Sequence, residues 1–463
     1  MVYDLKSFEK FIPNKKTYAV FGNPISHSLS PALHTQLATE SGMDFDYIAI
    51  ETSNEDFPYA LELAKEKLCG FNLTMPFKQL VLPYVEVMHE NVLRSGSANT
   101  IKVVNGKLHA FTTDGIGLCA ALRLSVKSLA GERVLILGAG GTARSVAAQI
   151  AIEGAHVTVA VRSAEKGEVF VRELSEKTGL TAFSYVMFNK IPDSFDILIN
   201  TTPVGMNNEN LAPVNLSDFT GLKLVYDCIY SPPMTPLLRD AEKLGIPWDN
   251  GLSMLVLQGA YSERHWFDAS FDNEIIKKTI HNLRVQHAIS RLKSVYNKSN
   301  IALTGFMGSG KTTIGKLLAE ALNMDFIDLD AKIENEQKLK ITEIFDKYGE
   351  DHFRALETKA CEDCIKLENT VISTGGGTVI HYENDKILKN SSVILFLNRT
   401  FEQIEKNLQG STSRPLLQVN NVREHIRSLY DLRQPQYIDK ADISVTFQNN
   451  DVSDAAEHIL YFI

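Results

Sequence analysis

Short apolar runs alternate with longer amphipathic segments along most of this chain, and the alternation predicts parallel sheets flanked by helices. In the first 300 residues, runs rich in β-branched and apolar side chains lie at 18–21, 134–137, 157–161, 197–199 and 224–226. Segments of helical period separate them, as is typical of βα units. The pattern restarts at 299–304, after a polar and amphipathic stretch at 272–298. We therefore predict an α/β protein whose main boundary lies near residues 288–299.

Length and composition narrow the class of protein. The chain has 463 residues, which at about 100 to 200 residues per domain predicts two to four domains. The N-terminus has no apolar segment after a basic start, and no apolar run reaches about 18 residues, so we expect neither export nor a membrane span. The five cysteines form no dense paired framework, which favours a reducing compartment. We therefore expect a cytoplasmic protein.

The charge distribution argues against a nucleic-acid partner. The formal net charge is −9, with 29 basic and 31 acidic side chains in residues 1–300, and 18 basic and 25 acidic ones in residues 301–463. Neither part has the basic excess of a nucleic-acid binder. We expect small-molecule partners, no nucleic acid and no membrane, and the sequence leaves open whether the chain is a monomer or a homodimer.

A glycine-rich loop follows the second of these predicted strands. Strand Arg133–Leu137 runs into Gly138-Ala-Gly-Gly-Thr-Ala143 and then into a helix-like segment. This is G-x-G-x-x-A in its strand–turn–helix setting, where the glycines allow a tight turn and close approach to a pyrophosphate, and the helix N-terminus offers free N–H groups. We predict a dinucleotide site at Gly138, Ala139, Gly140, Gly141, Thr142 and Ala143.

The next predicted strand ends in basic residues that favour NADP over NAD. Arg162-Ser163 ends this strand, and Lys166 lies one turn further on. A free ribose 2′-hydroxyl usually meets an acidic residue here, whereas an arginine suits a 2′-phosphate by charge and bidentate geometry. We predict that Arg162, Ser163 and Lys166 contact NADP; the alternative is that these are solvated loop charges.

Further polar motifs surround this unit. They are Gly22–Pro31 (GNPISHSLSP), Gly70–Lys78 (GFNLTMPFK), Ser95–Thr100 (SGSANT), Thr113–Gly115 (TDG), Asn200–Met206 (NTTPVGM), Tyr230–Pro236 (YSPPMTP) and Gly251–Gln258 (GLSMLVLQ). Through these motifs and the GAGGTAR loop, residues 1 to about 288 resemble shikimate dehydrogenase. One departure is Ala110-Phe-Thr-Thr-Asp114, where the family usually has G-x-N-T-D.

The resemblance implies a substrate domain at 1–110, completed by 235–288, with an NADP-binding Rossmann domain inserted at 111–234. It implies reduction of 3-dehydroshikimate by NADPH, with Lys78 as the acid/base and Asp114 beside it. A lysine close to a carboxylate is favoured in its charged form, which suits stabilisation of an alkoxide. By resemblance, the substrate contacts are Ser28, Ser30, Thr74, Lys78, Asn99, Asp114, Tyr230 and Gln258.

The same resemblance adds Thr201, Gly251 and Met254 to the cofactor contacts. Three assignments in this part have structural alternatives. Ser30 has the residue type and position of a helix N-cap, Met254 of a core side chain, and His27 is expected to brace the serine loop rather than to transfer protons.

A second glycine-rich loop opens the C-terminal part. After the predicted strand at 300–304 comes Gly305-Phe-Met-Gly-Ser-Gly-Lys-Thr312, a complete G-x-x-x-x-G-K-T motif at the start of a helix. The backbone of such a loop holds phosphates, its lysine reaches the β and γ phosphates, and its hydroxyl binds Mg²⁺. We predict that ATP contacts Gly308, Ser309, Gly310, Lys311, Thr312 and Thr313, with Mg²⁺ on Thr312.

The remaining C-terminal motifs resemble shikimate kinase over residues 300–463, which leaves 289–299 as a linker. They are Phe326–Asp330, Phe345, Phe353-Arg354 with Glu357, Gly375–Gly377, Ser413–Leu417 and Arg433–Tyr437. The resemblance implies a P-loop kinase domain with a parallel sheet. It places shikimate on Asp330, Phe345, Phe353, Arg354, Gly375, Gly376, Gly377 and Arg433.

Catalysis in this part is assigned to Asp330, Lys311 and Arg414. Arg414 lies in a small-residue stretch suited to a closing lid and is also expected to contact ATP. Asp328 either assists Mg²⁺ through water or serves as a helix N-cap. Cys361-Glu-Asp-Cys364 has no second pair of ligands, so we interpret it as helix core rather than as a redox or zinc site.

The two parts together predict consecutive reactions, one that makes shikimate and one that phosphorylates it. We therefore predict a bifunctional enzyme that uses NADPH, ATP and Mg²⁺. The alternative hypothesis is a quinate/shikimate dehydrogenase of broader specificity, with one half serving as a metabolite-binding regulatory module.

Overall fold

The computed structural model describes residues 2–26, 28–206, 211–408, 422–447, 452 and 454–463. The chain divides into two compact units, Met1–Leu283 and Arg284–Ile463. The division falls inside one long helix, α11 (Asn273–Ser294), a few residues before the predicted linker at 289–299. No helix among the described residues is long and apolar enough to cross a membrane.

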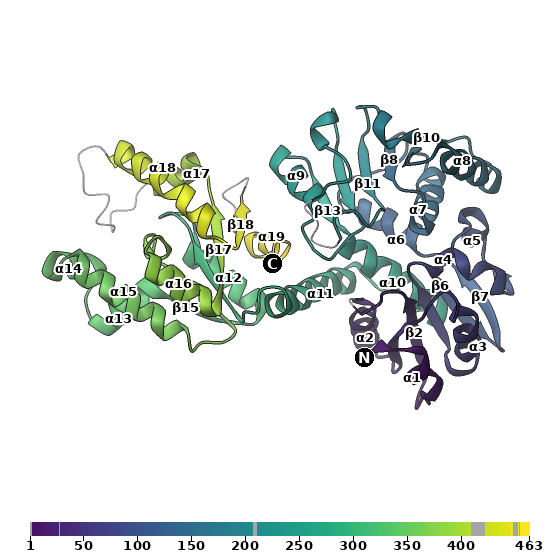
Figure 1. Ribbon diagram of the computed structural model, residues 1–463, viewed down its shortest axis with the longest axis horizontal. Helices are drawn as coiled ribbons and strands as arrows, with labels where there is room; N and C mark the ends of the chain where they lie inside the picture. Colours follow the sequence, from purple (N-terminus) through teal and green to yellow (C-terminus); the bar gives the residue numbers. More distant parts are fainter. Residues whose placement is uncertain (1, 27, 207–210, 409–421, 448–451, 453) are drawn as a thin grey trace. The chain divides into compact units, whose positions relative to one another are not determined.

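The first unit begins with a seven-stranded sheet in the order β1-β3-β2-β4-β6-β7-β5. Figure 1 labels β2, β6 and β7 of this sheet. The strands from β1 to β4 are parallel, and β6 is antiparallel to both its neighbours. β2 is buried at every position, which explains its uninterrupted apolar run. The strands are β1 (Val2–Tyr3), β2 (Thr17–Gly22), β3 (Asp46–Glu51), β4 (Gly70–Leu73), β5 (Val87–Met88), β6 (Thr100–Val104) and β7 (Lys107–Phe111). The helices are α1 (Leu5–Lys10), α2 (Ser30–Ser41), α3 (Phe57–Lys67), α4 (Phe77–Leu80) and α5 (Glu90–Ser95), with a 3₁₀ turn η1 (Leu82–Tyr84).

The second sheet of this unit has six parallel strands in the order β10-β9-β8-β11-β12-β13. Counted from β8 this is 3-2-1-4-5-6, the doubly wound order in which a dinucleotide binds where the order reverses, at β8 and β11. The strands are β8 (Arg133–Leu137), β9 (His156–Val161), β10 (Phe183–Met187), β11 (Ile197–Asn200), β12 (Leu224–Asp227) and β13 (Trp248–Asn250). The helices are α6 (Asp114–Leu122), α7 (Gly141–Ile152), α8 (Ala164–Thr178), α9 (Pro236–Leu244) and α10 (Gly251–Phe267), with 3₁₀ turns η2 (Phe188–Lys190) and η3 (Leu216–Asp218).

The Rossmann sheet extends beyond the boundary predicted at residue 234. β13 pairs in parallel with β12, so α9 and β13 form one more βα unit of this sheet rather than part of the substrate domain. The chain then enters α10, which packs against both α6 and α2. α10 is thus the helix that links the Rossmann part to the substrate part within this unit.

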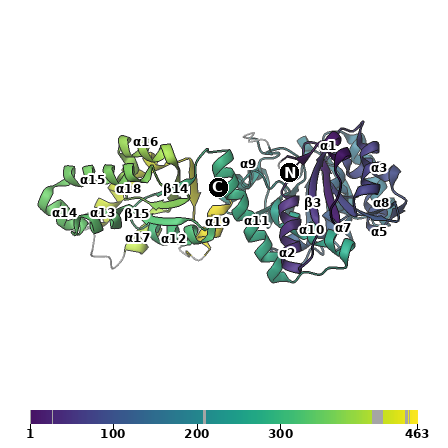
Figure 2. The same ribbon diagram turned by 90° about the horizontal axis from the view of Figure 1, so that it is seen from below.

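The second unit is built on a five-stranded parallel sheet in the order β15-β16-β14-β17-β18. α12 and α19 cover one face with the end of α11, and α15, α16 and α18 cover the other (Figure 2). The strands are β14 (Asn300–Thr304), β15 (Asp325–Asp328), β16 (Thr370–Ser373), β17 (Ser392–Asn398) and β18 (Ile443–Thr446). The helices are α12 (Lys311–Leu322), α13 (Leu329–Gln337), α14 (Ile341–Tyr348), α15 (Glu350–Cys364), α16 (Tyr382–Ser391), α17 (Phe401–Leu408), α18 (Val422–Lys440) and α19 (Ala455–Leu460), with a 3₁₀ turn η4 (Thr378–Ile380). These sheets confirm the predicted α/β class.

Candidate functional sites

The first glycine loop, Gly138–Ala143, connects β8 to α7 and has the backbone that a dinucleotide requires. Gly138 has φ +102°, and a Cβ there would lie 3.0 Å from Thr202 Cγ2 and 3.1 Å from Thr201 Oγ1, so only glycine fits without strain. The Thr201 hydroxyl donates to the Leu137 carbonyl at 2.6 Å, which fixes this threonine beside the loop. No described side chain caps the start of α7, so its N–H groups are available to an anion.

The basic residues predicted to select NADP lie at the end of the neighbouring strand. Arg162 follows β9, Ser163 is the N-cap residue of α8, and Lys166 lies in the first turn of that helix. Arg162 and Lys166 are exposed, and neither has an ion-pair partner among the described residues. Two cations beside the glycine loop, not neutralised by protein carboxylates, fit a 2′-phosphate better than a ribose hydroxyl.

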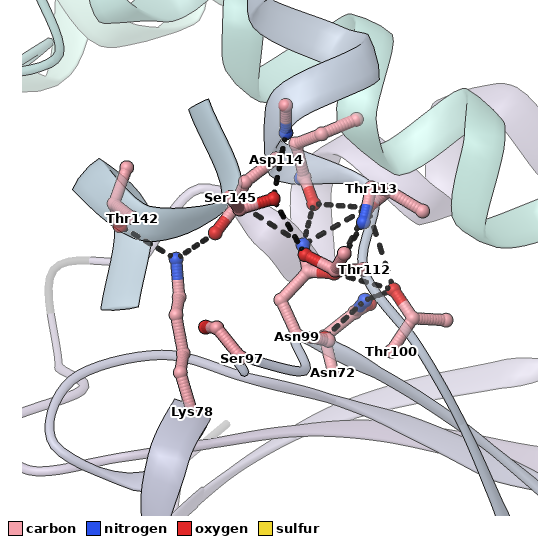
Figure 3. Close-up of polar contacts among 12 residues, drawn as sticks. Asn72, Lys78, Ser97, Asn99, Thr100, Thr112, Thr113, Asp114, Thr142 and Ser145 are labelled. Atoms are coloured by element: carbon pink, nitrogen blue, oxygen red, sulfur yellow. Dashed lines mark hydrogen bonds and ion pairs between the residues drawn. The ribbon is translucent and has the colours of Figure 1, made fainter. Parts of the chain in front are cut away.

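Lys78 lies between a carboxylate and the glycine loop (Figure 3). The short helix α4 presents its ammonium, which donates to Asp114 Oδ2 at 2.6 Å and to Thr142 Oγ1 at 3.0 Å. Asp114, the first residue of α6, has a side chain only 4% exposed, whereas that of Lys78 is 16% exposed. The ammonium is therefore held in place, and the lysine side chain remains partly exposed to solvent. Gly141 allows this approach, because a Cβ there would lie 3.1 Å from Lys78 Cβ.

Asn99 connects the predicted substrate residues on this side of the unit. Its amide nitrogen lies 2.9 Å from Asp114 Oδ1, 2.9 Å from Thr113 Oγ1 and 3.0 Å from Gln258 Oε1. Its oxygen accepts from the Thr113 backbone N–H at 2.7 Å. All four of these residues are buried. The sequence motifs named Asn99, Asp114 and Gln258 but missed the role of Thr113, whose only signal was its place in the TDG segment, directly before Asp114.

Thr112, which stands where the family usually has asparagine, forms a hydrogen bond with a side chain of α7. The Thr112 hydroxyl lies 2.8 Å from Ser145 Oγ on α7, and Ser145 Oγ also accepts from the Gly115 N–H at 3.0 Å. The loop before Asp114 is therefore tied to the helix that begins at the glycine loop. Gly115 itself allows this contact, since a Cβ there would lie 2.3 Å from the Ser145 carbonyl oxygen.

The serine loop lies at the start of α2. Ser30 is the first residue of this helix and the N-cap position falls on Leu29, so Ser30 is not the cap. Ser28 Oγ accepts from the Ser30 N–H at 3.2 Å, and a Cβ on Gly22 would lie 2.6 Å from Thr74 Cγ2. Thr74 thus lies beside the end of β2, the strand from which the loop with Ser28 and Ser30 begins. His27 lies outside the described residues.

Tyr230 and Met254 are placed by apolar packing. Tyr230 packs beside Leu29 against the apolar cluster between α2, α10 and α11, and burial raises the pKa of its phenol. Met254 is 7% exposed and belongs to the Rossmann core. Gly251, at the start of α10, has no room for a side chain, because a Cβ would lie 2.1 Å from the Cys228 carbonyl oxygen.

Asp227 fixes the turn that carries Tyr230. At the end of β12 its carboxylate accepts from Asn200 Nδ2 at 3.0 Å, the Ile229 N–H at 3.1 Å and the Thr235 hydroxyl at 2.7 Å. Burial raises the pKa of this carboxyl to about 7, against the lowering effect of its three donors. The residue that follows, Cys228, was not predicted from the sequence. Burial raises its thiol pKa, and Asp114 and Lys78 are close enough to influence it electrostatically.

The second glycine loop, Gly305–Thr312, has three glycines at positive φ: Gly305 at +148°, Gly308 at +79° and Gly310 at +94°. Lys311 Nζ donates to the Gly305 carbonyl at 2.8 Å and to the Phe306 carbonyl at 3.1 Å. The ammonium thus lies over the loop where phosphates bind.

A cavity of about 430 Å³ lies beside this loop. Its lining includes Lys311, Thr312, Asp328 and Asp330 from one side and Gly376 from the other. Thr312 Oγ1 donates to Asp328 Oδ2 at 2.7 Å, while Asp328 Oδ1 accepts from the Ala331 N–H, so Asp328 is also the N-cap of α13. A hydroxyl and a carboxylate oxygen at the phosphate loop are hard ligands that fit Mg²⁺.

Arg354 is held against the glycine strand end by a buried carboxylate. Its guanidinium contacts Glu357 at 2.8 Å and Glu350 at 2.9 Å, and Glu357 is 1% exposed. Glu357 Oε1 also accepts from the Thr378 hydroxyl at 2.6 Å. A Cβ on Gly377 would lie 3.0 Å from the guanidinium. Glu357 is thus the residue that fixes this arginine.

The other predicted substrate residues surround the same region. A Cβ on Gly375 would lie 2.9 Å from Asp330 Oδ1. Arg433 donates to the Gly376 carbonyl at 3.4 Å. The Tyr437 hydroxyl also donates to this carbonyl. The sequence did not single out Tyr437 as a site residue. The rings of Phe345 and Phe353 lie 4.8 Å apart. Arg414 lies outside the described residues.

The C-x-x-C motif lies in the core of the second unit. Cys361 and Cys364 are both buried on α15, and burial raises the pKa of both thiols, that of Cys364 to about 11. Among the described residues no group of three or more His, Cys, Asp and Glu side chains is arranged to hold a metal ion. The burial of both cysteines agrees with the core interpretation.

Comparisons with known proteins assign each unit to a family. Residues 20–101 match the model "Shikimate dehydrogenase substrate binding domain", residues 120–207 match "Shikimate / quinate 5-dehydrogenase", and residues 307–463 match "Shikimate kinase".

Two of the similar proteins are shikimate dehydrogenases (NADP(+)). That of Citrifermentans bemidjiense is 38% identical over 262 residues, 55% of this chain and 90% of the relative, and that of Methanococcus maripaludis is 36% identical over 271 residues, 58% of this chain and 97% of the relative. A crystal structure of shikimate 5-dehydrogenase from Thermus thermophilus with NADP(H) and shikimate is similar at a TM-score of 0.53 and 31% identity, covering 58% of this chain and all of that chain. This chain therefore belongs to the shikimate dehydrogenase family in its first unit and carries a shikimate kinase domain in its second.

Proposed function

We propose that this chain reduces 3-dehydroshikimate to shikimate with NADPH in its first unit and phosphorylates shikimate with ATP and Mg²⁺ in its second. The observation that carries the reduction is the placement of Lys78, which contacts both Asp114 on the substrate side and Thr142 in the cofactor loop. The phosphorylation is supported by one cavity that is lined by Gly308 and Gly310–Thr313 of the phosphate loop and also by Asp330.

When bound, NADPH would supply a hydride to the ketone carbon, and Lys78 is placed to supply the proton. Two of the three N–H groups of its ammonium are directed at Asp114 and Thr142, which leaves the third for the ketone oxygen. As the carbonyl becomes an alkoxide, the positive charge stabilises it and the proton moves from Nζ to oxygen. The lysine, 16% exposed, then regains a proton from solvent.

The hydroxyls and carboxylate of the substrate are assigned to the polar groups around Lys78. Asn99 and Gln258 lie within one hydrogen-bonded cluster with Asp114. Ser28 and Ser30 lie at the start of α2, Thr74 lies beside Gly22 at the end of β2, and Tyr230 packs beside Leu29. We propose that these six residues bind the substrate.

For the cofactor, we assign the pyrophosphate to the loop Gly138–Ala143 and the 2′-phosphate to Arg162, Ser163 and Lys166. Thr201, Gly251 and Met254 are assigned to the remainder of the cofactor. The exposed and unneutralised guanidinium of Arg162 supports a preference for NADP over NAD.

In the kinase unit we assign the carboxylate of shikimate to Arg354 and Arg433, with Phe345, Phe353 and the strand end Gly375–Gly377 around its ring. Asp330 is assigned to the hydroxyl that receives the phosphoryl group. Lys311 neutralises charge on the transferred phosphoryl group, and Thr312 with Asp328 holds Mg²⁺. The assignment of Arg414 to ATP stays a sequence prediction.

We further propose that the enzyme acts in the cytoplasm, which its five free thiols support. No finding favours the alternative in which one half is a regulatory module. The catalytic residues assigned above argue against this alternative, because the first unit has Lys78 beside Asp114 and the second has Lys311 and Asp330 in one cavity.

The proposal is tested by two assays on the purified full-length chain. NADPH oxidation is measured with 3-dehydroshikimate, and ADP formation is measured with shikimate. We expect both activities, a preference for NADPH over NADH, and weaker turnover of quinate in the reverse reaction. Absence of either activity in protein that shows a cooperative thermal transition would contradict the assignment of that unit.

A further inference from the structure

A buried pair of ionisable side chains joins two helices of the first unit, and none of the reactions above uses it. His34 on α2 and Glu263 on α10 are both fully buried, and His34 Nδ1 lies 2.8 Å from Glu263 Oε1. His34 Nε2 and Glu263 Oε2 have no hydrogen-bond partner among the described residues. Burial raises the pKa of the Glu263 carboxyl, and the contact with His34 opposes this rise.

Such a pair is an unusual choice for stability alone. Two apolar side chains of similar volume would join the helices equally well or better, because a buried ion pair must overcome the desolvation of both groups. What the polar pair adds is directionality, since a single hydrogen bond fixes the relative register of α2 and α10 in a way that apolar contact does not. The location of the pair decides what that register controls.

Each helix carries a proposed substrate contact close to the pair. Ser30 lies four residues before His34, hence on the same face of α2, and Gln258 lies five residues before Glu263 on α10. At Gly259 a Cβ would lie 2.5 Å from Leu33 Cδ2, so the Leu33 side chain of α2 packs directly on the backbone of α10 there. A fixed register of α2 and α10 would therefore set the separation of Ser30 and Gln258, the two proposed substrate contacts.

A second chain of contacts runs from His34 towards Asn99. The His34 ring stacks on Tyr47 with centroids 4.2 Å apart, and the Tyr47 hydroxyl donates to Asn72 Oδ1 at 2.7 Å. Asn72 Nδ2 lies 3.1 Å from the Asn99 carbonyl oxygen and 3.0 Å from Ser262 Oγ. Figure 3 shows the Asn72 side chain beside Asn99 and Thr100.

Ser262, the neighbour of Glu263, belongs to a polar layer that also contains Tyr47, Asn72, Thr100 and Thr113. Its hydroxyl lies 2.8 Å from Thr100 Oγ1 and 3.3 Å from Thr113 Oγ1. Thr113 in turn holds the Asn99 side-chain oxygen through its backbone N–H. The polar layer thus connects the His34–Glu263 pair to Asn99 through side chains on α10, β4 and β6.

From this arrangement we propose that His34 and Glu263 are a positioning pair, which fixes Ser30, Asn99 and Gln258 in the geometry that binds the polyol. The pair acts through these residues and does not touch the substrate or the cofactor. The inference rests on the proposed dehydrogenase function of this unit. Misplacing a positioning group by about 1 Å can cost about 10²-fold in kcat/KM.

The test measures steady-state kinetics of shikimate oxidation by the full-length chain and by Glu263→Leu, Glu263→Gln and Leu37→Ala. Leu37 is a fully buried residue on α2 outside the polar layer, so its truncation is a matched packing control. We expect Glu263→Leu to lower kcat/KM for shikimate about 10- to 100-fold, mainly through KM, with NADP⁺ affinity and kinase activity unchanged. Glu263→Gln, which keeps an oxygen for His34, is expected to stay within about threefold of wild type, and so is Leu37→Ala.

The proposal is overturned if Glu263→Leu leaves KM for shikimate within about twofold of wild type, or if Leu37→Ala raises it equally. If Glu263→Leu does not fold, His34→Leu and His34→Asn are compared instead; Asn retains an N–H donor near the Nδ1 position, and the proposal then requires the lower shikimate KM in His34→Asn. Wild-type turnover of shikimate is measured first, so that failure of the dehydrogenase assignment is seen separately from failure of the positioning pair.

Discussion

Replacement of Lys78 by alanine probes the proton donor assigned to the dehydrogenase. The change removes the ammonium that contacts Asp114 at 2.6 Å and Thr142 at 3.0 Å. General acid catalysis contributes about 10²- to 10⁴-fold, equivalent to about 3 to 5 kcal/mol of transition-state stabilisation. Because Asp114 still accepts from Asn99 at 2.9 Å, its carboxylate is not left without a donor, and we expect a folding penalty of only about 1 to 3 kcal/mol.

The assay compares kcat for 3-dehydroshikimate reduction in wild type, Lys78→Ala and Lys78→Arg. An arginine keeps a positive charge beside Asp114 but does not release a proton at neutral pH, so it separates electrostatic stabilisation from proton transfer. We expect both variants to lose at least about 10²-fold in kcat. NADP⁺ affinity and kinase activity in the same samples report that the chain is folded. The reasoning is refuted if Lys78→Ala keeps kcat within about tenfold of wild type.

Three further predictions concern other parts of the chain. Lys311→Met should lower kinase activity about 10²- to 10³-fold and leave NADPH oxidation unchanged, and equal losses in both assays would count against it. Glu357→Gln frees Arg354 from a charged partner, so the kinase KM for shikimate should rise about 10- to 100-fold with little change in KM for ATP; a selective effect on ATP would contradict the assignment. Because burial raises the pKa of Asp227 to about 7, the folded state binds this proton more tightly than the unfolded state, and stability from it is present at low pH and is lost as pH rises towards 7. The difference in unfolding free energy between wild type and Asp227→Asn should therefore shift by up to about 4 kcal/mol in favour of the variant between pH 4 and 8 in denaturant titrations, and a constant difference would refute the prediction.

The sequence was most informative where function depends on a contiguous segment. The loops Gly138–Ala143 and Gly305–Thr312 carry their geometry in their glycines, which have positive φ at Gly138, Gly305, Gly308 and Gly310. Their strand–turn–helix settings are also local patterns, so both nucleotide-binding folds could be predicted without coordinates.

The sequence was least informative where a group acts through a distant partner. His34 and Glu263 are 229 positions apart. Taken alone, each is a polar residue of a kind common in helices, so the sequence does not indicate that the two are paired. The contact of Lys78 with Thr142 likewise depends on how the substrate part folds back onto the Rossmann part. β13 was missed for a related reason, since a three-residue edge strand carries too few positions for a periodic pattern.

The central claim is that one chain performs two consecutive reactions, and a single incubation tests it most directly. The purified chain is mixed with 3-dehydroshikimate, ATP and Mg²⁺, and ADP is followed before and after NADPH is added. We predict no substrate-dependent ADP formation until NADPH is present, and then ADP and NADP⁺ in equal final amounts with shikimate 3-phosphate as the product. NADPH oxidation without subsequent ADP formation, or ADP formation that does not depend on NADPH, would contradict the account.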